Sequence, residues 1–498
     1  MREIFFPQMS LGQIAIPAIK IEGHSRDDIP VILLGLQQIY IDRELREAVF
    51  RILKEMIPRK EEDGGTSTPV SMEKGRPGMN QWAILVLGVL RLGLNADYDR
   101  ILELANQHKT LREMLGHSGL ASDYRYRLQT LKDNLKLFTP ELLTRINHEV
   151  IAAGHRLLDQ AVDAPLGARC DSFVLKTDVH FPTDLNLLYD AIRVAIRECV
   201  HWSEAYPLPG WRQHAYHLRK FKKQYRKLQK MKHSTSRDAA KKAARQGEIE
   251  QACRDYLDLA QGYLDRALES WASLQQIHRV PRGLLVELQM FCGHAERQIK
   301  QIRRRVLQDE KIAHEEKVFS LFEPHTEWIS KGKAGVPVEL GMRVCILEDR
   351  HGFILHSQVM QKTTDDKVAV AMIQAAKAQF PGLHTVSFDK GFHSPSNQKE
   401  LKGLLDHVVL PKKGKCSKAE RERETAPEFE AARRRHSAVE SAINALQVHG
   451  LDRCPDHGLE GFERYVALAV LSRNIQQLGA IVRRQEQQRL ADQHKQAA

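Results

Sequence analysis

Residues 341–360 read GMRVCILEDRHGFILHSQVM, two runs of apolar and β-branched residues on either side of DRHG at 349–352. Two such runs around a short turn that contains glycine predict a β-hairpin. After it we expect a helix over 365–380, a strand over 383–389 (LHTVSFD) and, beyond a further helix, a short strand over 407–411 (HVVLP). Because strands and helices alternate here, the region predicts a mixed α/β sheet.

An earlier stretch, ARCDSFVLKTDVHFPTD at 168–184, has the β-branched and aromatic residues of a first strand and ends in a Pro-Thr-Asp turn. Residues 185–202 return to helix, and 203–318 are predicted to be almost wholly helical because apolar residues recur there at helical spacing. Helices over 428–447 and 462–478 complete the pattern. The expected order is one strand, a large helical insertion, and then β-β-α-β-α-β-α.

The length of 498 residues suggests about three domains, and the composition, 42% hydrophobic and 28% charged, is that of a globular protein. The net charge of +12 favours a polyanionic partner. The longest apolar run, Trp82–Leu90, is far shorter than a bilayer requires, so we expect no membrane partner. The seven cysteines are dispersed, with no CxxC pair, which favours reduced thiols and a cytoplasmic location.

These patterns divide the chain into four expected regions. Several short helices separated by turns make 1–150 a helical region that suits a helical bundle or a helix-turn-helix module. An α/β core is expected from 151–190 together with 321–480. A basic helical insertion, 191–320, separates the two parts of this core, and 481–498 form a polar tail.

The insertion concentrates positive charge, with thirteen Lys and Arg but one acidic residue between 212 and 245. Six of these side chains are candidate contacts for DNA phosphates. Aromatic residues interleave with them, and these either stack on unpaired bases or form the core of a helical hairpin. The basic candidates are Arg219, Lys220, Lys222, Lys223, Arg226 and Lys227, and the aromatic residues are Trp211, Tyr216, Phe221 and Tyr225.

Three acidic residues occupy positions from which they can converge. Asp171 lies within the first strand, Asp389 ends the strand LHTVSF, and Glu440 lies on a late helix beside an apolar stripe. Carboxylate oxygens suit Mg²⁺ or Mn²⁺, and two such ions activate the attacking and leaving oxygens in phosphodiester chemistry. The alternative is that each is a solvated surface acid, as most of the 63 acidic residues are expected to be.

The sequence around these acids resembles the DDE transposases of bacterial insertion sequences, particularly the ISNCY group. The resemblance extends discontinuously from about 75 to 480. It is carried by GRPGM (75–79), LVLGVLRLGLNADYDRILELAN (85–106), CDSFVLKTDVHFPTDLNLLYDAIR (170–193), FEPHTEWISKGKAGVPVELG (322–341), DRHGFILHSQVM (349–360), SFDKGFHSPSNQKEL (387–401), RRRHSAVESAINALQVHGLDR (433–453) and GLEGFERYVALAVLSRNIQQLG (458–479).

The resemblance implies an RNase H-like catalytic core in which Asp171, Asp389 and Glu440 hold two Mg²⁺ or Mn²⁺ ions. It also implies that the enzyme binds the terminal inverted repeats of an insertion sequence as double-stranded DNA. In such enzymes water attacks a phosphodiester at the element's end, and the exposed 3′-OH then attacks target DNA. Pairing two ends implies at least a DNA-bound homodimer, located in the bacterial cytoplasm with the nucleoid.

Asp178 and Asp184 also follow the first strand. Asp171 is preferred because the matching family block begins with it, and because the odd offset of seven places Asp178 on the opposite strand face. Many relatives carry Tyr, Arg and Lys around the glutamate, where this chain has Arg433, His436 and Gln447. A hairpin mechanism therefore does not follow from the resemblance.

Several further residues are auxiliary candidates. Lys390 and His393 are candidate contacts for a phosphate or leaving group, and His436 and Asn444 lie one helical turn either side of Glu440. Arg433, Arg434 and Arg435 either contact DNA phosphates or form a solvated basic helix face.

Other functional classes stay open at this stage. An RNase H-like nuclease without strand transfer would share the acids. A catalytically inactive DNA-binding remnant is disfavoured because the acids and their flanking blocks are intact. An RNA-binding helical scaffold would leave the two acidic strand positions unused.

Overall fold

The computed structural model describes residues 3–5, 11–56, 59–61, 67–69, 78–121, 123–161, 164–206, 208–277, 279–330 and 337–497. Residues 75–77 of GRPGM and 331–336 of the 322–341 block therefore lie outside the described residues. The chain forms two compact units. The sheet unit comprises 1–58, 69–178 and 327–498, and the helical unit comprises 59–68 and 179–326.

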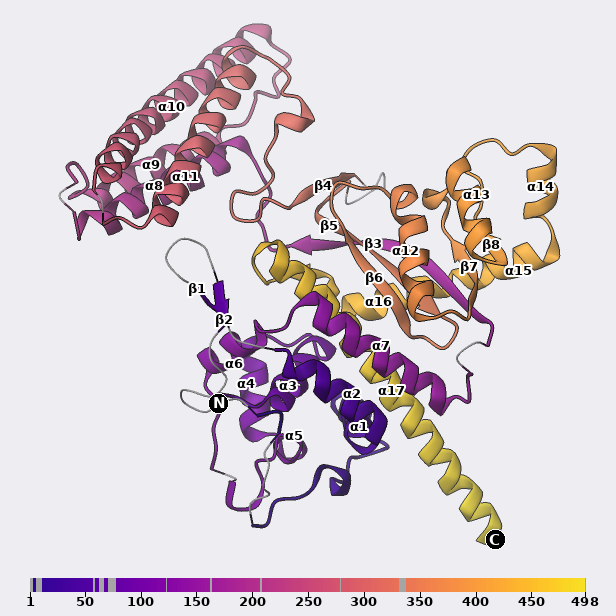
Figure 1. The fold of residues 1–498 in the computed structure, drawn as a ribbon. Coiled ribbons are helices and arrows are strands. Elements are labelled where there is room, and N and C mark those ends of the chain that lie inside the picture. Colours follow the sequence, from indigo (N-terminus) through magenta and orange to yellow (C-terminus); the bar gives the residue numbers. More distant parts are fainter. Residues whose placement is uncertain are drawn as a thin grey trace. The chain divides into compact units, whose positions relative to one another are not determined.

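The sheet unit is built around β3 (Leu166–Thr177), which lies at the centre of a mixed sheet (Figure 1). On one side β3 pairs antiparallel with β5, and β5 pairs antiparallel with β6, so the predicted hairpin is present. On the other side β3 pairs parallel with β7, and β7 pairs parallel with β8. The remaining strands of this sheet are β4 (Glu327–Ser330), β5 (Val338–Asp349), β6 (Ile354–Met360), β7 (Leu383–Phe388), β8 (His407–Val409) and β9 (Arg453–Cys454).

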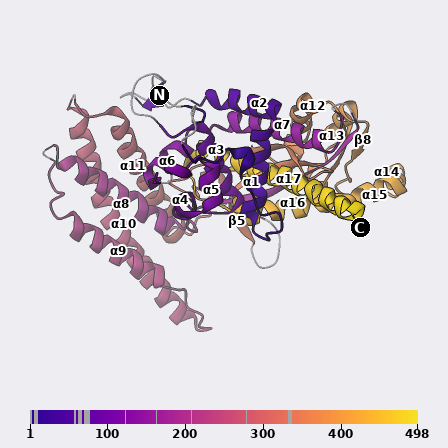
Figure 2. The same cartoon turned by 90° about the horizontal axis from the view of Figure 1, so that it is seen from below.

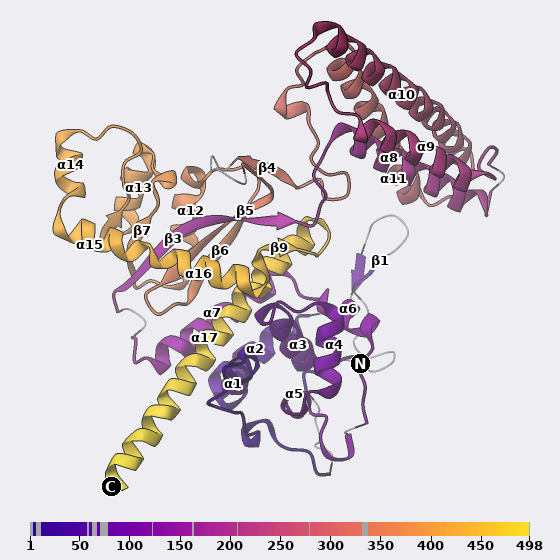
Figure 3. The same cartoon turned by 180° about the vertical axis from the view of Figure 1, so that it is seen from behind.

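Helices cover both faces of this sheet (Figures 1 and 3). Cys170 and Val386 share one apolar cluster with α12, whereas Phe173 and Leu175 on the opposite face share a cluster with α16 and α17. This division follows from the alternation of side chains along a strand. The helices of this region are α12 (Asp365–Gln379), α13 (Pro395–Leu404), α14 (Lys418–Glu424), α15 (Pro427–His436), α16 (Ala438–Leu446) and α17 (Gly458–Ala497).

The single helix expected over 428–447 is instead two helices, α15 and α16, that meet at Ser437. The hydroxyl of Ser437 donates to the carbonyl of Arg434 at 2.8 Å, so a side chain satisfies one of the last carbonyls of α15. His436 and Asn444 therefore belong to different helices.

The N-terminal helices share one apolar cluster with one face of the sheet. Trp82 on α3 is fully buried in the same apolar cluster as Phe173 and Met342 of the sheet. Gly35 of α1 and Gly479 of α17 allow these two helices to cross closely, since a Cβ on Gly479 would lie 1.9 Å from the Val31 carbonyl oxygen. The helices are α1 (Asp28–Ile41), α2 (Arg43–Lys54), α3 (Gln81–Gly93), α4 (Tyr98–Gln107), α5 (Lys109–Met114), α6 (Leu128–Leu135) and α7 (Pro140–Leu157).

The helical unit consists mainly of four long helices that run alongside one another (Figure 2). Thr183 and Asn186 form a capping box that starts α8, and Asp238 caps α10. The unit has its own apolar core, in which Phe221 stacks on Tyr256 with ring centroids 4.9 Å apart. Its helices are α8 (Asp184–Ser203), α9 (His214–Lys230), α10 (Ala239–Gln275) and α11 (Arg282–Ile302).

Short elements complete the described chain. Strands β1 and β2 pair with each other. Among the short helical segments, η5 matters most for the site, because it follows β7 directly. The short elements are β1 (Arg59–Glu61), β2 (Ser67–Pro69), η1 (Ile16–Ala18), η2 (Gly119–Ala121), η3 (Arg303–Leu307), η4 (His314–Glu316), η5 (Lys390–Phe392) and η6 (Gln447–Leu451).

Candidate active site

Asp171 lies in the middle of β3, where it pairs in register with Ile346 of β5. Its Oδ1 accepts the backbone N–H of Ser172 at 2.7 Å, which lowers the pKa of the carboxyl group. Burial has the larger, opposite effect and raises the pKa of Asp171 to about 6, with further increases from the carboxylates of Asp389, Asp365 and Glu440. A half-buried carboxylate thus lies within electrostatic reach of three other acids.

Asp389 is positioned by the end of β7. Because Cys170 pairs with Phe388 across the parallel ladder, the next residues along, Asp171 and Asp389, are neighbours. Asp389 caps η5, its Oδ2 accepting the N–H of Gly391 at 3.5 Å, and its side chain is exposed. This location, outside the carboxyl end of a parallel strand, is where α/β sheets place ligand-binding groups.

Asn397 holds the loop after Asp389 in place. Its buried Nδ2 donates to the carbonyls of Phe392, at 2.8 Å, and of Asp366, at 2.6 Å. The cap of α13 is Ser394, whose hydroxyl accepts the N–H of Asn397 at 3.1 Å. The loop that carries Asp389 is therefore tied to the start of α12.

Glu440 lies in the first turn of α16, with its side chain exposed. Val439, Ala442 and Leu446 are buried and fix this helix against the sheet. Position 440 therefore lies at the edge of the core, as its flanking apolar stripe predicts, and its carboxylate acts electrostatically on Asp171 and His436.

His436 joins the end of α15 to β7, since its Nδ1 lies 3.0 Å from the hydroxyl of Ser387. Burial lowers the pKa of His436, and the carboxylates of Asp389 and Glu440 oppose this effect. The ring thus lies among the acids, and its pKa favours the neutral form at neutral pH.

Asp365 is a fourth acid that the sequence analysis did not single out. Its Oδ1 accepts a hydrogen bond of 2.6 Å from the hydroxyl of Ser172, next to Asp171. A Cβ on Gly391 would lie 3.0 Å from its Oδ2, so the same carboxylate also lies against the loop after Asp389. In the sequence it is one of two acids in the first turn of a helix, which is an ordinary helix-start pattern.

The other candidates near the acids differ in their surroundings. Lys390 on η5 and Asn444 on α16 are exposed, and His393 is half-buried. Arg434 is paired with Glu430 at 3.3 Å, whereas the carbonyl of Arg435 accepts a hydrogen bond from Arg169 at 3.4 Å. The arginine run 433–435 is exposed on α15.

Asp178, the alternative first acid, lies beyond the end of β3, where it pairs with Arg453 at 3.1 Å. Asp178 lies seven positions after Asp171, roughly 23 Å along an extended chain. Asp184 lies at the start of α8, where it pairs with Arg305 at 2.9 Å. Within the sheet unit, it is Asp171 that lies in electrostatic contact with Asp389 and Glu440.

The six basic candidates of the insertion all lie exposed on α9, and they have no acidic partner within the described residues. The aromatic residues between them are mostly internal. Trp211 and Phe221 are buried, and Tyr225 stacks on Tyr189, so these three form the core of the helical unit. Tyr216 remains exposed.

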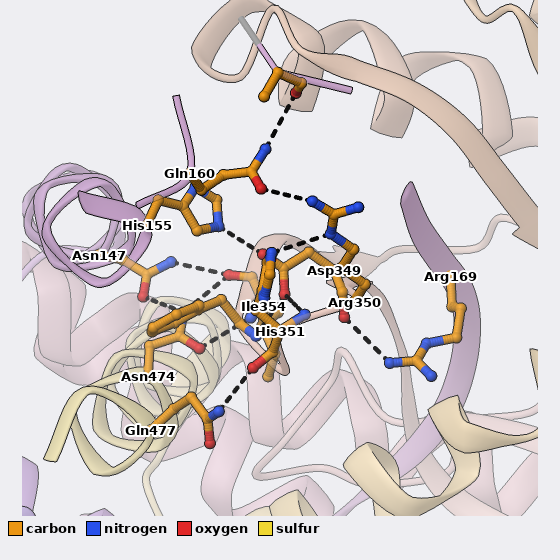
Figure 4. A network of polar contacts seen from close by, with 12 residues as sticks. Asn147, His155, Gln160, Arg169, Asp349, Arg350, His351, Ile354, Asn474 and Gln477 are labelled. Atoms are coloured by element: carbon orange, nitrogen blue, oxygen red, sulfur yellow. Dashed lines mark hydrogen bonds and ion pairs between the residues drawn. The ribbon is translucent and has the colours of Figure 1, made fainter. Parts of the chain in front are cut away.

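A buried polar network lies behind the site, where the β5–β6 turn meets α7 and α17 (Figure 4). The fully buried carboxylate of Asp349 accepts the N–H groups of His351 and Phe353 and lies 2.7 Å from Nε2 of His155. Arg169 donates to the carbonyl of Asp349 at 3.1 Å and forms an ion pair with Glu348 at 2.9 Å. The network fixes the strand that carries Asp171.

No group of three or more His, Cys, Asp or Glu side chains in the described part of the chain is arranged to hold a metal ion. No helix of the described residues has the length and apolar character needed to span a bilayer. The seven cysteines all lie within the described residues as thiols, and six of them are buried.

One family model matches the chain. Residues 307–475, about a third of the sequence, are similar to the family described as "Transposase DDE domain". The matched range contains Asp389 and Glu440 and begins well after Asp171. A search of curated proteins and a search of solved structures each found no match.

Proposed function

We propose that this chain is a DDE transposase of the ISNCY group that binds the terminal inverted repeats of an insertion sequence, cleaves at its ends and joins the 3′-OH ends to target DNA. One observation carries the proposal. Asp171, Asp389 and Glu440 gather on one face of the sheet, and the carboxylates of Asp389 and Glu440 add to the burial that raises the pKa of Asp171. The transposase domain match over residues 307–475 supports the same conclusion.

The arrangement of the sheet supports an RNase H-like core. The strand with the first acid is central, with an antiparallel hairpin on one side and two parallel strands on the other. The second acid follows the first of these parallel strands, and the third lies on a helix that covers the same face. The helical unit, 179–326, interrupts this core between its first strand and the hairpin.

The donor set suits Mg²⁺ or Mn²⁺ in its chemistry, because it consists of carboxylate oxygens, although these side chains are not drawn together around an ion in the described structure. Asp171, Asp389 and Glu440 would hold two ions. When bound, such ions polarise a phosphodiester and lower the pKa of water. Relief of the repulsion at Asp171 would favour their binding.

The chain's own residues would orient the DNA. Lys390 and His393 flank Asp389 and would contact the phosphate or the leaving group. His436, held by Ser387, would accept or donate a proton near Glu440, with Asn444 alongside on α16. Arg433, Arg434 and Arg435 would contact the backbone of the bound strand.

The exposed basic face of α9 would bind the phosphates of double-stranded DNA. The affinity of this binding would fall as the salt concentration rises. The helices of 1–150 would read the terminal repeat. Because two element ends must be joined, the active form would be a homodimer or a larger paired-end complex, bound to the nucleoid in the cytoplasm.

A cleavage and joining assay tests the proposal. The substrate is a duplex with the element's own terminal repeat, incubated with Mg²⁺ or Mn²⁺, and wild type is compared with Asp171→Asn, Asp389→Asn and Glu440→Gln. We expect wild type to cut and join the duplex, and the three acid variants to bind it without cutting. Asp178→Asn is the matched control and should stay active.

The same assay separates the alternatives. Cutting without joined products would indicate an RNase H-like nuclease without strand transfer. Binding without cutting in either metal would indicate an inactive DNA-binding remnant. If Asp171→Asn stayed active while Asp178→Asn did not, the assignment of the first acid would be wrong.

A further inference from the structure

A pocket of about 530 Å³ opens between the sheet and α15, beside the acidic site. Its volume lies in the range of small-ligand sites, roughly 300–1,000 Å³. Its floor comes from the start of β3 and from β7, and its walls from the β5–β6 turn and the α15–α16 helices. The polar side chains that line it are those of Arg169, Arg350, Thr385, Ser387, Arg434 and Arg435.

The charge of this lining is strongly positive, since it has four arginines and no acidic residue. Glu348 pairs with Arg169, and Glu430 pairs with Arg434. Arg350 instead donates to neutral groups, and Arg435 donates to a backbone carbonyl. Two cationic side chains thus lack a carboxylate partner among the described residues, which favours an anionic ligand such as a phosphate.

One buried donor of the lining is also unused. Nε of Arg169 has no hydrogen-bond partner within the described residues, although both Nη atoms donate to carbonyl groups. Buried donors without a partner are uncommon in folded proteins. Because this Nε is itself shielded from solvent, contacts to a ligand in the pocket fall to the exposed cations Arg350 and Arg435.

The rest of the lining is apolar. Pro165 contributes at the start of β3, and Ala432 and Ala438 contribute from the helices. A ligand that matches both the arginines and the apolar residues of the lining has an anionic group joined to a less polar body. A phosphorylated deoxyribonucleoside has this character. A paired base in a duplex is stacked inside the helix and cannot enter a concave pocket of this size.

The pocket lies directly behind the acids. Arg169 of β3 pairs in register with Ser387 of β7, and both line the pocket. Two residues further along the same strands, on the same face, are Asp171 and Asp389, roughly 6–7 Å away. A nucleotide in the pocket and the phosphodiester joined to it would therefore reach from the pocket to Asp171 and Asp389.

We propose that this pocket binds one unpaired nucleotide of a DNA strand, with its phosphate at Arg350 and Arg435 and its sugar and base against the apolar lining. The phosphodiester next to that nucleotide then lies at the acids. The inference rests on the proposed function, because it assigns the pocket to the strand that is cut.

The test measures binding in EDTA, so that no strand is cut. The full chain is titrated with a short blunt duplex and with the same duplex carrying a single-stranded thymidine overhang. We expect tighter binding of the overhang duplex by about tenfold, the effect of one charge-assisted contact. Taking the ratio of the two affinities cancels the contribution of basic surfaces elsewhere, such as α9.

Three variants examine the pocket itself. Arg350→Ala and Arg435→Ala each remove an exposed cation, and Ala438→Trp fills the pocket without changing its charge. We expect each to reduce the affinity ratio to about one. Arg421→Ala, which removes an exposed arginine of α14 outside the pocket, should keep the wild-type ratio. A ratio of one in wild type, or a ratio that survives all three pocket variants, would overturn the inference.

Competition identifies the source of the bound nucleotide. If free thymidine monophosphate abolishes the overhang preference, the pocket binds a nucleotide whether or not it is part of a strand. If it does not, the strand itself is required. Loss of the preference with inorganic phosphate alone would contradict binding of a nucleoside. The protein could prefer the overhang duplex, lose this preference in the pocket variants, and still never cut DNA. That result would refute the proposed function but support the nucleotide pocket.

Discussion

Replacing Asp171 with asparagine should make the sheet unit more stable at neutral pH while abolishing cleavage. Asparagine has nearly the same shape and its Oδ1 can still accept the N–H of Ser172, so the main change is the loss of a buried negative charge. In the wild type that charge is disfavoured by burial and by the carboxylates of Asp389, Asp365 and Glu440.

The magnitude follows from the pKa of Asp171, which folding raises from 3.8 to about 6. At about 1.4 kcal/mol for each pKa unit, the ionised group destabilises the folded state by roughly 3 kcal/mol. Because the folded pKa is the higher one, the penalty is absent below about pH 4, grows as the pH rises toward 6, and is complete above it. Asp171→Asn should therefore gain about 2–3 kcal/mol at pH 7.5 and nothing near pH 4.

The assay is denaturant unfolding of wild type and Asp171→Asn at both pH values, without divalent metal. Asp178→Asn is the matched control, because its exposed ion pair with Arg453 is worth at most about 1 kcal/mol, so it should show no gain. Added Mg²⁺ should stabilise wild type more than Asp171→Asn. A variant that is less stable than wild type at pH 7.5, or a gain that does not change with pH, would refute the reasoning.

Three further changes test other parts of the molecule. Gly479→Val should destabilise the sheet unit by about 3 kcal/mol in thermal unfolding, because a Cβ 1.9 Å from the Val31 oxygen forces α1 and α17 apart. Asp365→Asn should lower the cleavage rate about 10–100-fold, although asparagine can still accept the Ser172 hydroxyl, because it removes a charge beside the acids. Lys223→Gln on α9 should reduce the slope of log affinity for duplex DNA against log salt by about 0.9, the effect of one phosphate contact.

Each of these has a matched control. Gly461→Ala, on the same helix as Gly479 but with no atom closer than 3.5 Å to the added carbon, should be neutral or stabilising. Asp366→Asn, in the same first turn as Asp365, should leave cleavage within a fewfold of wild type. Lys300→Gln, whose ammonium is already paired with Glu296, should leave the salt slope unchanged. If variant and control behave alike in any pair, the local explanation for that pair is wrong.

Much of the sheet could be predicted because its signals are local. The hairpin, β3 and β7 each consist of runs of β-forming residues bounded by turn residues. Strands of this kind can be predicted from the local sequence pattern alone. The break at Ser437 was missed, although Ser437 followed three residues later by Glu440 matches the S-x-x-E pattern of a helix start. That Trp82 and Phe173 belong to one apolar cluster could not be predicted, because periodicity shows that a helix face is buried but not which residues cover it.

The candidate site was predictable in its acids and not in its surroundings. Asp171 and Asp389 follow strand patterns, so their convergence could be inferred from the chain order. Asp365 looks like any acid at a helix start, and its role beside Ser172 arises from a contact between residues 193 positions apart. The aromatic residues near α9 show the same limit, because Phe221 could be assigned to the core only once its stacking on Tyr256 was known.

The pairing of β3 with β5 also has a consequence for how the chain reaches its native state. These neighbouring strands are separated by the 160 residues from 178 to 337. Pairs so distant in sequence raise the contact order and slow folding, because the intervening loop must close first. The consecutive helices α8–α11 have a core of their own and can form before that closure, which shortens the effective loop. During synthesis β3 thus emerges long before its partner, and it must stay unpaired until the ribosome has delivered the whole helical unit and then β5.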